Sequence, residues 1–185
     1  AGTLTWTHDS KHIIVSANTR EDADFDIFNS DLIAVEIRSG KTTKLTDSTG
    51  PESNPAISPD GKKLAFTGFE DNGKSSQINE LYVMNPQGGD IRQLTPRLDR
   101  SVSDIKWAQD STGLYFSYDN KGKKHVAYVA LDGEITVKTD ALGGQSIGRP
   151  YTSGDYEGPD TGDVIYTQST GDRPADLVAM TRKGA

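Results

Sequence analysis

Short apolar stretches recur along the whole chain, and polar turns rich in glycine, aspartate and serine separate them. The stretches are rich in β-branched and aromatic residues, as in Leu32-Ile-Ala-Val-Glu-Ile37 and Leu114-Tyr-Phe-Ser117, which is typical of β-strands. No stretch shows the 3.6-residue period of an amphipathic helix over a sufficient length. The pattern therefore predicts an all-β protein.

Three copies of one motif lie about 50 residues apart, and each joins a hydrophobic residue, a turn with Asp-Ser or Asp-Gly, and an apolar strand. The turn aspartates are Asp9, Asp60 and Asp110. In the second copy Pro59 presets φ, Asp60 bonds within the turn and Gly61 accepts a positive φ. A weaker fourth copy follows at Gly162-Asp-Val-Ile-Tyr-Thr167.

Each repeat also has a second half, in which an apolar strand is followed in the first three copies by a glycine-containing turn and a short last strand. Four strands in a unit of roughly 50 residues are the signature of a β-propeller blade. We expect one propeller segment over 1–185, with approximate blades 1–46, 47–95, 96–139 and 140–185. The fourth blade is expected to be incomplete, so the sequence predicts an open fragment of a larger propeller. Hydrophobic residues at one position of the innermost strands are expected to pack between blades: Trp6, Ile57 and Trp107.

The repeat resembles the Asp-Gly repeat of TolB-like propellers and of the N-terminal propeller of prolyl-oligopeptidase-type serine peptidases. Two segments favour the peptidases. The acidic stretch 19–32 is similar to an Asp-rich loop of acylaminoacyl-peptidase-like members, and Leu98-Asp-Arg-Ser-Val-Ser103 is similar to their segment before an inner strand. The resemblance implies a propeller of about seven blades that caps a separate C-terminal α/β-hydrolase domain and restricts access to oligopeptides. Because that domain supplies the Ser, Asp and His, the resemblance implies a hydrolase parent with no catalytic residue in this chain.

One stretch, Gly144-Gln-Ser-Ile-Gly148, matches the G-x-S-x-G nucleophile motif literally. That motif works only as a sharp turn between a buried strand and a helix. Here the preceding residues do not form an apolar strand, Arg149-Pro150 follows, and every histidine precedes Ser146. We therefore interpret the stretch as a glycine-rich connection between blades.

The closely spaced carboxylates of Asp22, Asp24 and Asp26 raise the question of a calcium loop. An EF-hand is excluded because Ile27 and Ile33 occupy the places of its glycine and its glutamate. A solvated acidic loop is the favoured interpretation, and a looser calcium loop is the alternative. The histidines, which are His8, His12 and His125, show no metal-ligand spacing. We expect no metal and no cofactor.

Composition narrows the range of partners. The net charge of −7 disfavours nucleic acid, because non-specific binding to phosphates requires an excess of Lys and Arg. No apolar run approaches the roughly 18–20 residues of a membrane helix, so we expect no membrane partner. Cysteine is absent, which excludes thiol chemistry and is compatible with either the periplasm or the cytoplasm.

In an up-and-down blade the connections alternate between two faces, and the tight turns are expected on one of them. The long connections are expected on the other: 17–30, 46–53, 68–79, 95–102, 139–148 and 168–175. Long loops on a rigid scaffold are the usual place for binding residues. There, carboxylates suit a substrate ammonium and guanidinium groups suit a carbonyl or carboxylate. The candidate substrate-binding residues are Arg20, Glu21, Asp24, Arg97 and Arg100.

The predicted function is to gate and position oligopeptides for the separate C-terminal hydrolase domain. The alternative is a TolB-like scaffold for protein–protein interaction without an enzymatic domain, and a self-contained lectin or lyase propeller is a third hypothesis. Because an open propeller leaves unpaired strand edges, edge-to-edge self-association is a further expectation.

Overall fold

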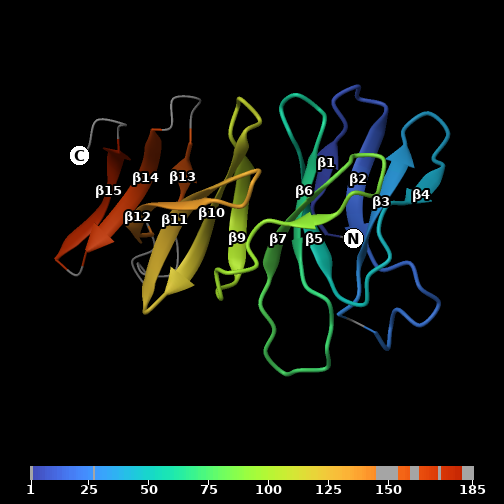
Figure 1. The fold of residues 1–185 in the computed structure, drawn as a ribbon, viewed down its shortest axis with the longest axis horizontal. Coiled ribbons are helices and arrows are strands. Elements are labelled where there is room, and N and C mark those ends of the chain that lie inside the picture. Colours follow the sequence, from blue (N-terminus) through green and yellow to red (C-terminus); the bar gives the residue numbers. More distant parts are fainter. Residues whose placement is uncertain (1, 27, 145–153, 159–162, 171, 181–185) are drawn as a thin grey trace. The chain divides into compact units, whose positions relative to one another are not determined.

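The computed structural model describes residues 2–26, 28–144, 154–158, 163–170 and 172–180. The chain divides into two compact units, Ala1–Val102 and Ser103–Ala185, and each is described by itself. Every regular element in the described ranges is a β-strand, and successive strands pair antiparallel as meanders (Figure 1). The prediction of an all-β protein is confirmed.

The first unit holds two four-stranded sheets. The first sheet has the order β1 (Leu4–Trp6), β2 (His12–Ala17), β3 (Asp31–Glu36) and β4 (Thr42–Lys44). The second has the order β5 (Glu52–Ile57), β6 (Leu64–Gly68), β7 (Glu80–Met84) and β8 (Arg92–Gln93). Sequential antiparallel order is the meander expected of a blade.

The second unit repeats this arrangement, and its first strand starts at the boundary between the units. One sheet has the order β9 (Val102–Trp107), β10 (Gly113–Asn120), β11 (Lys123–Ala130) and β12 (Ile135–Leu142). The other has three strands within the described residues: β13 (Tyr156–Glu157), β14 (Val164–Thr170) and β15 (Arg173–Met180).

The repeated aspartates close the first hairpin of three sheets, as the motif predicts. Asp9 Oδ1 accepts hydrogen bonds from Thr7 Oγ1 (2.7 Å) and the Lys11 amide (3.0 Å). Asp60 Oδ1 accepts two equivalent hydrogen bonds, from Ser58 Oγ (2.6 Å) and from the Lys62 amide (3.1 Å). Hydrogen bonds to an ionised carboxylate stabilise its charged form. The Ser58 hydroxyl, foremost, therefore holds the pKa of Asp60 below its usual range.

A second repeated feature lies inside the sheets, where hydroxyl side chains sit on the second strand of each blade. The four hydroxyl residues are about 50 positions apart and all are buried: Ser16, Thr67, Ser117 and Thr167. Thr67 Oγ1 accepts a hydrogen bond from Asn54 Nδ2 (3.0 Å), and Ser117 Oγ donates to Asp104 Oδ2 (2.6 Å). Asn54 and Asp104 have φ values of 52° and 50°, so each inner strand turns sharply at this point.

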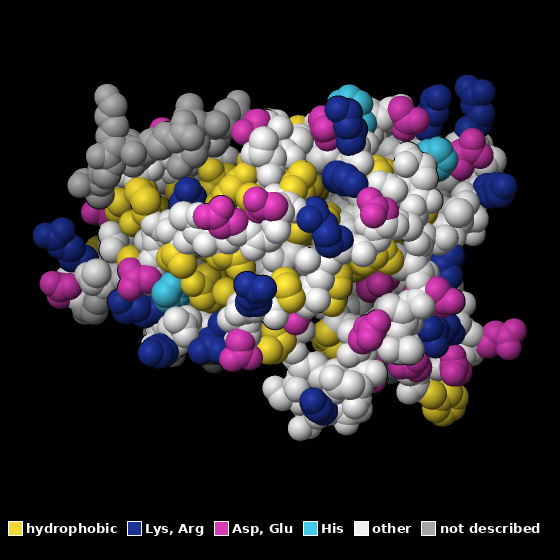
Figure 2. Space-filling view, in the orientation of Figure 1, with side chains coloured by type: hydrophobic (Ala, Val, Ile, Leu, Met, Phe, Trp, Pro, Cys, Tyr) yellow, Lys and Arg dark blue, Asp and Glu magenta, His cyan; other side chains and the backbone are white. Residues whose placement is uncertain are grey.

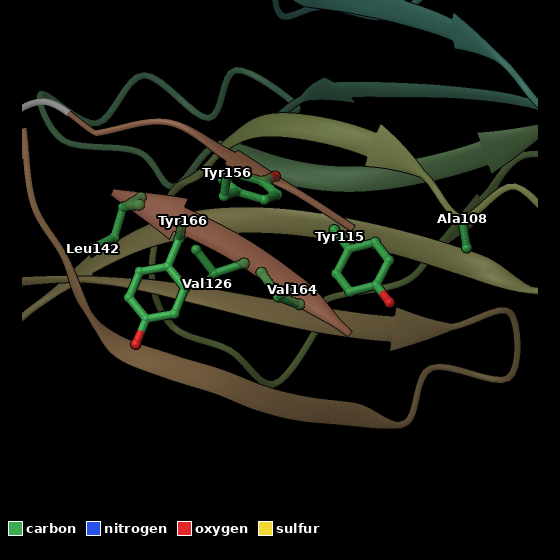
Figure 3. Close-up of a cluster of buried hydrophobic side chains, with 7 residues drawn as sticks. All are labelled: Ala108, Tyr115, Val126, Leu142, Tyr156, Val164 and Tyr166. Atoms are coloured by element: carbon green, nitrogen blue, oxygen red, sulfur yellow. The ribbon is translucent and has the colours of Figure 1, made fainter. Parts of the chain in front are cut away.

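Each unit has its own hydrophobic core between its two sheets. In the first unit the core joins β2 and β3 to β6 and β7, and its buried residues are Ile14, Leu32, Ala34, Leu64, Phe66 and Met84. The partly buried Ile57 packs against this core. This confirms the inter-blade packing expected of Ile57. In the second unit the corresponding cluster, drawn in Figure 3, joins side chains of both sheets: Ala108, Tyr115, Val126, Leu142, Tyr156, Val164 and Tyr166. Trp6 differs from the expectation, since its side chain is 50% exposed.

The connections of the first unit alternate between two ends, as the meander requires. The hairpins β1–β2 and β5–β6 lie at the top of Figure 1, and the long loops β2–β3 and β6–β7 lie at the bottom. In the second unit one connection differs from the expectation: 168–175 was predicted to be a long loop and is mostly strand. The β10–β11 link, for which no long loop was predicted, is a two-residue turn at Lys121 and Gly122, both with positive φ.

Candidate functional site

Arg20, a predicted substrate-binding residue, is engaged by the protein itself. Its guanidinium lies 3.9 Å from Asp26 and 3.9 Å from Asp47, and Nη2 donates to the Ser48 carbonyl (3.0 Å). These contacts join the β2–β3 loop to the β4–β5 connection, which are the two loops at that end of the first sheet. Arg20 therefore has a structural role in holding the loops together.

Glu21 and Asp24 lie on the exposed turn of the β2–β3 loop. Two hydrogen bonds shape the loop: the Asn18 side chain donates from Nδ2 to the Asp26 carbonyl (2.8 Å), and the Phe25 amide donates to the Asp22 carbonyl (2.8 Å). Figure 2 shows acidic side chains gathered at the lower right, over this loop. Both carboxylates are thus accessible at the long-loop end of the unit.

Arg97 and Arg100 lie on a different connection, between β8 and β9. Arg97 is exposed, and Arg100 Nη1 lies 3.3 Å from Asp99 Oδ2. The predicted binding residues therefore lie on two separate connections. Arg20, Glu21 and Asp24 lie on the β2–β3 loop, and the two other arginines lie between β8 and β9.

No group of three or more His, Asp or Glu side chains in the described ranges is arranged to hold a metal ion. No helix in the described part of the chain is long and apolar enough to cross a membrane. Ser146 of the G-x-S-x-G match lies outside the described residues.

A buried carboxylate, Glu52, lies at the start of β5 and was not among the predicted site residues. Glu52 is 5% exposed, and its Oε2 atom accepts no hydrogen bond from any described residue. Burial raises the pKa of Glu52, and the neighbouring charge of Asp31 adds to the rise, while the Thr46 and Ser48 hydroxyls oppose it. The Asp31 carboxylate is itself paired with Lys44 at 2.9 Å.

A second carboxylate, the half-buried Glu80, lies in the same row of the sheet. Glu52 is paired with Gly68, and Gly68 is paired with Glu80, so both glutamates project from the same face on either side of a glycine. Glu80 Oε2 also accepts no hydrogen bond within the described residues, and burial raises the pKa of Glu80.

Aromatic side chains occupy the next row on this face. Phe66 and Tyr82 pair across β6 and β7, and their rings stack with centroids 5.2 Å apart. Burial raises the pKa of Tyr82, and the negative charges of Glu80, Glu70 and Glu52 raise it further. Three carboxylates therefore act on one aromatic side chain.

These residues line a pocket of about 220 Å³, which we call the acidic pocket. Its walls combine carboxylates with aromatic and aliphatic side chains: Asp47, Ser48, Glu52, Phe66, Gly68, Phe69, Glu70, Tyr82 and Ile91. A second hollow of about 280 Å³ shares Phe69, Glu70 and Tyr82 with it and also contacts Glu80. A pocket with apolar walls and unpaired carboxylates suits the cationic group of a ligand.

The repeat itself contains the signal that identifies Glu52. The Glu52 amide donates to the Ser30 carbonyl (2.9 Å), and the Val102 amide donates in the same way to the Asn79 carbonyl (2.7 Å). Glu52 and Val102 therefore hold equivalent positions 50 residues apart in neighbouring blades. Glu52 has a carboxylate side chain at this position, whereas Val102 has an apolar one. Aligning the blades residue by residue would have singled out Glu52.

Comparison with known proteins gives relatives of two kinds. No protein-family model matches the chain. The chain is 27% identical over 156 residues to dipeptidyl-peptidase 5 of Porphyromonas gingivalis, covering 83% of this chain and 21% of that protein. It is 27% identical over 128 residues to the Tol-Pal system protein TolB of Francisella tularensis, covering 69% and 26%. It is 28% identical over 115 residues to Tricorn protease of Thermoplasma acidophilum, covering 60% and 9%. The chain thus spans about a quarter or less of these relatives.

Solved structures establish the fold. The β-propeller domain of the Trilobed protease from Pyrococcus furiosus matches 96% of this chain and 48% of that chain, with a TM-score of 0.62 and 18% identity. A puromycin hydrolase matches 98% of this chain and 29% of its own chain, with a TM-score of 0.69 and 17% identity. An oligogalacturonate lyase in complex with manganese matches 100% of this chain and 51% of its own chain, with a TM-score of 0.72 and 15% identity. The resemblance predicted from the Asp-Gly repeat is confirmed: the chain is a β-propeller segment related in sequence to dipeptidyl-peptidase 5 and to TolB.

Proposed function

We propose that the chain is the substrate-handling propeller segment of a serine peptidase, which gates and positions oligopeptides for a separate C-terminal α/β-hydrolase domain. The observation that carries the proposal is the similarity to dipeptidyl-peptidase 5, which extends over 83% of the chain. This chain then contributes recognition and access, and the hydrolase domain contributes the nucleophile.

The geometry of the first unit supports a role in recognition. The exposed carboxylates of Glu21 and Asp24 lie at the long-loop end, where they suit the ammonium of a peptide. Arg97 and Arg100 lie on a connection of their own and suit a backbone carbonyl or a carboxylate. Arg20 supports the acidic loop through Asp26 and Ser48.

Kinetics of the full-length protein test this role. Arg100→Ala is expected to lower kcat/KM for an oligopeptide by about tenfold, because a hydrogen bond to a charged group contributes about 1.5–3 kcal/mol. Hydrolysis of a small ester should be unchanged. The control is Arg38→Ala, an exposed arginine at the β3–β4 turn. Unchanged KM and kcat for the oligopeptide would remove Arg100 from the site.

The similarity to TolB supports a second candidate, a scaffold for protein–protein interaction without an enzymatic domain. The two candidates differ in what accompanies the propeller. A fluorophosphonate probe, which reacts with activated serines, should label the full-length protein of a peptidase. Absence of labelling, together with no hydrolase sequence in the reading frame, would favour the scaffold.

A further inference from the structure

The buried carboxylate of Glu52 is expected to lower the stability of the folded protein. A buried carboxylate without a full set of hydrogen bonds is destabilising, and the equivalent position in the next blade is filled by Val102, which is 1% exposed. The backbone hydrogen bond at that position forms with either side chain. Since the architecture accepts an apolar residue there, the carboxylate needs another explanation.

The cations of the protein near the acidic pocket contact its wall at Asp47 and Ser48, or lie at its margin, and do not pair with Glu52 or Glu70. Lys44 pairs with Asp31 (2.9 Å) and Asp47 (2.5 Å), and Arg20 binds Ser48 and lies near Asp26 and Asp47. Lys74 lines only the adjoining hollow and is exposed. In the described residues, no ion pair neutralises Glu52, Glu70 or Glu80.

The walls of the acidic pocket indicate which kind of cation fits. A metal ion needs several polar ligands that converge on one point, and no three acidic side chains of the described residues are arranged in this way. The pocket instead presents Phe66, Phe69 and Tyr82 beside its carboxylates. Apolar walls match a methylene chain, and an ammonium at its end donates to carboxylate oxygens and is attracted by aromatic faces. An α-ammonium, in contrast, would bring the polar peptide backbone against these apolar walls.

We propose that the acidic pocket binds a primary alkylammonium, with the charged end at Glu52 and the alkyl chain along Phe66 and Tyr82. A lysine side chain of a peptide and a free diamine share this chemistry. The proposal concerns this chain alone and holds whether or not a hydrolase domain accompanies it.

Titration of the 185-residue chain with n-butylammonium, followed by NMR, tests the proposal. Binding is expected to be at least tenfold tighter than that of n-butanol, which has a similar shape and no charge. The variant Glu52→Gln keeps the shape of the side chain and should weaken n-butylammonium binding at least tenfold. Glu134→Gln, which removes an exposed carboxylate of the second unit, should leave it unchanged.

Binding should also tighten as the pH rises from 4 to 7, because an ammonium favours the ionised form of Glu52. The ionisable groups around Glu52 are Asp31 with its partner Lys44, and Asp47, Glu70, Glu80 and Tyr82. If Glu52→Gln does not fold, Glu80→Gln provides a second variant. Equal affinities for n-butylammonium and n-butanol, or equal binding by the wild type and the folded glutamine variant, would overturn the proposal.

Two probes distinguish the sources of the alkylammonium. N-acetyl-lysine methylamide carries one ammonium next to a peptide backbone, and 1,5-diaminopentane carries two without a backbone. Tighter binding of the lysine derivative would support a peptide ligand, and tighter binding of the diamine would support a free amine. Failure of both to compete with n-butylammonium would contradict the assignment to this pocket.

Discussion

Single residues with a positive φ decide where the strands of this protein turn. Gly61 has a φ of 71°, and a Cβ atom added there would lie 2.6 Å from Cβ of His8 in the neighbouring blade. Gly40 has a φ of 70°, and a Cβ atom added there would have no other atom within 4 Å. The two glycines therefore separate the cost of backbone strain from the cost of a steric clash.

Gly61→Ala is expected to destabilise the first unit more than Gly40→Ala does. Both substitutions place a Cβ atom in the left-handed region, at about 1–2 kcal/mol each, and only the first also displaces His8. Urea unfolding measures both free energies. Equal losses would show that the turn moves aside without cost.

The carboxylates of the first unit respond to pH in opposite directions. Hydrogen bonding lowers the pKa of Asp60, so its contribution to stability is lost as the pH falls. Burial raises the pKa of Glu52, so its contribution is present below the unfolded pKa and is lost as the pH rises through the folded pKa.

Glu52→Gln should therefore stabilise the first unit at pH 7, because a neutral amide avoids the desolvation of a charge. The gain should vanish near pH 3, where the wild-type carboxyl is protonated. Unfolding free energies across this range measure the effect, with Glu134→Gln as the control. Parallel profiles for wild type and Glu52→Gln would contradict the burial of a charged group.

The turn aspartates were predictable from sequence because their hydrogen-bond partners lie within two residues. The repeat marks the Glu52 position, but the surroundings of its side chain were not predictable, because the fold brings Asp31 of the preceding blade and Gly68 of the neighbouring strand to it. The contacts of Arg20 were not predictable for the same reason, since the fold brings Asp47 and Ser48 to it.

At the scale of elements, the buried hydroxyls of Thr67 and Ser117 connect the inner strands β5 and β9 to their neighbours β6 and β10. Thr67 accepts from Asn54 Nδ2 (3.0 Å) and lies 3.2 Å from the Ser53 hydroxyl. Most strands were predictable from their apolar residues, but the sharp bend at Asn54 was not, because no glycine marks it. The short β10–β11 turn was likewise hidden, since the polar 119–124 stretch suits either a loop or a hairpin.

Thr67→Val tests the importance of this connection. Valine preserves the shape of the side chain and removes the hydroxyl, so the hydrogen bond from Asn54 Nδ2 and the contact with the Ser53 hydroxyl are both lost. We expect a loss of about 1–3 kcal/mol in the unfolding free energy. Thr43→Val, at an exposed position of β4, should change it by less than about 0.5 kcal/mol. A similar small effect at Thr67 would mean that its hydrogen bonds do not stabilise the sheet.

At the scale of the whole molecule, the period of about 50 residues was sufficient to predict a propeller, because each blade repeats the same local chemistry. Function could be predicted only through resemblance, since the proposed recognition residues lie on loops that the repeat does not constrain. The separate blade boundaries and edge-to-edge association remain predictions.

We propose that this segment admits oligopeptides to a separate hydrolase domain. This can be tested by measuring kcat/KM of the full-length protein for one cleavage sequence, presented first in a short peptide and then within a long unfolded chain. We expect efficient cleavage of the peptide and little cleavage of the long chain. Equal cleavage of both, or cleavage of neither, would rule out selective admission by the propeller.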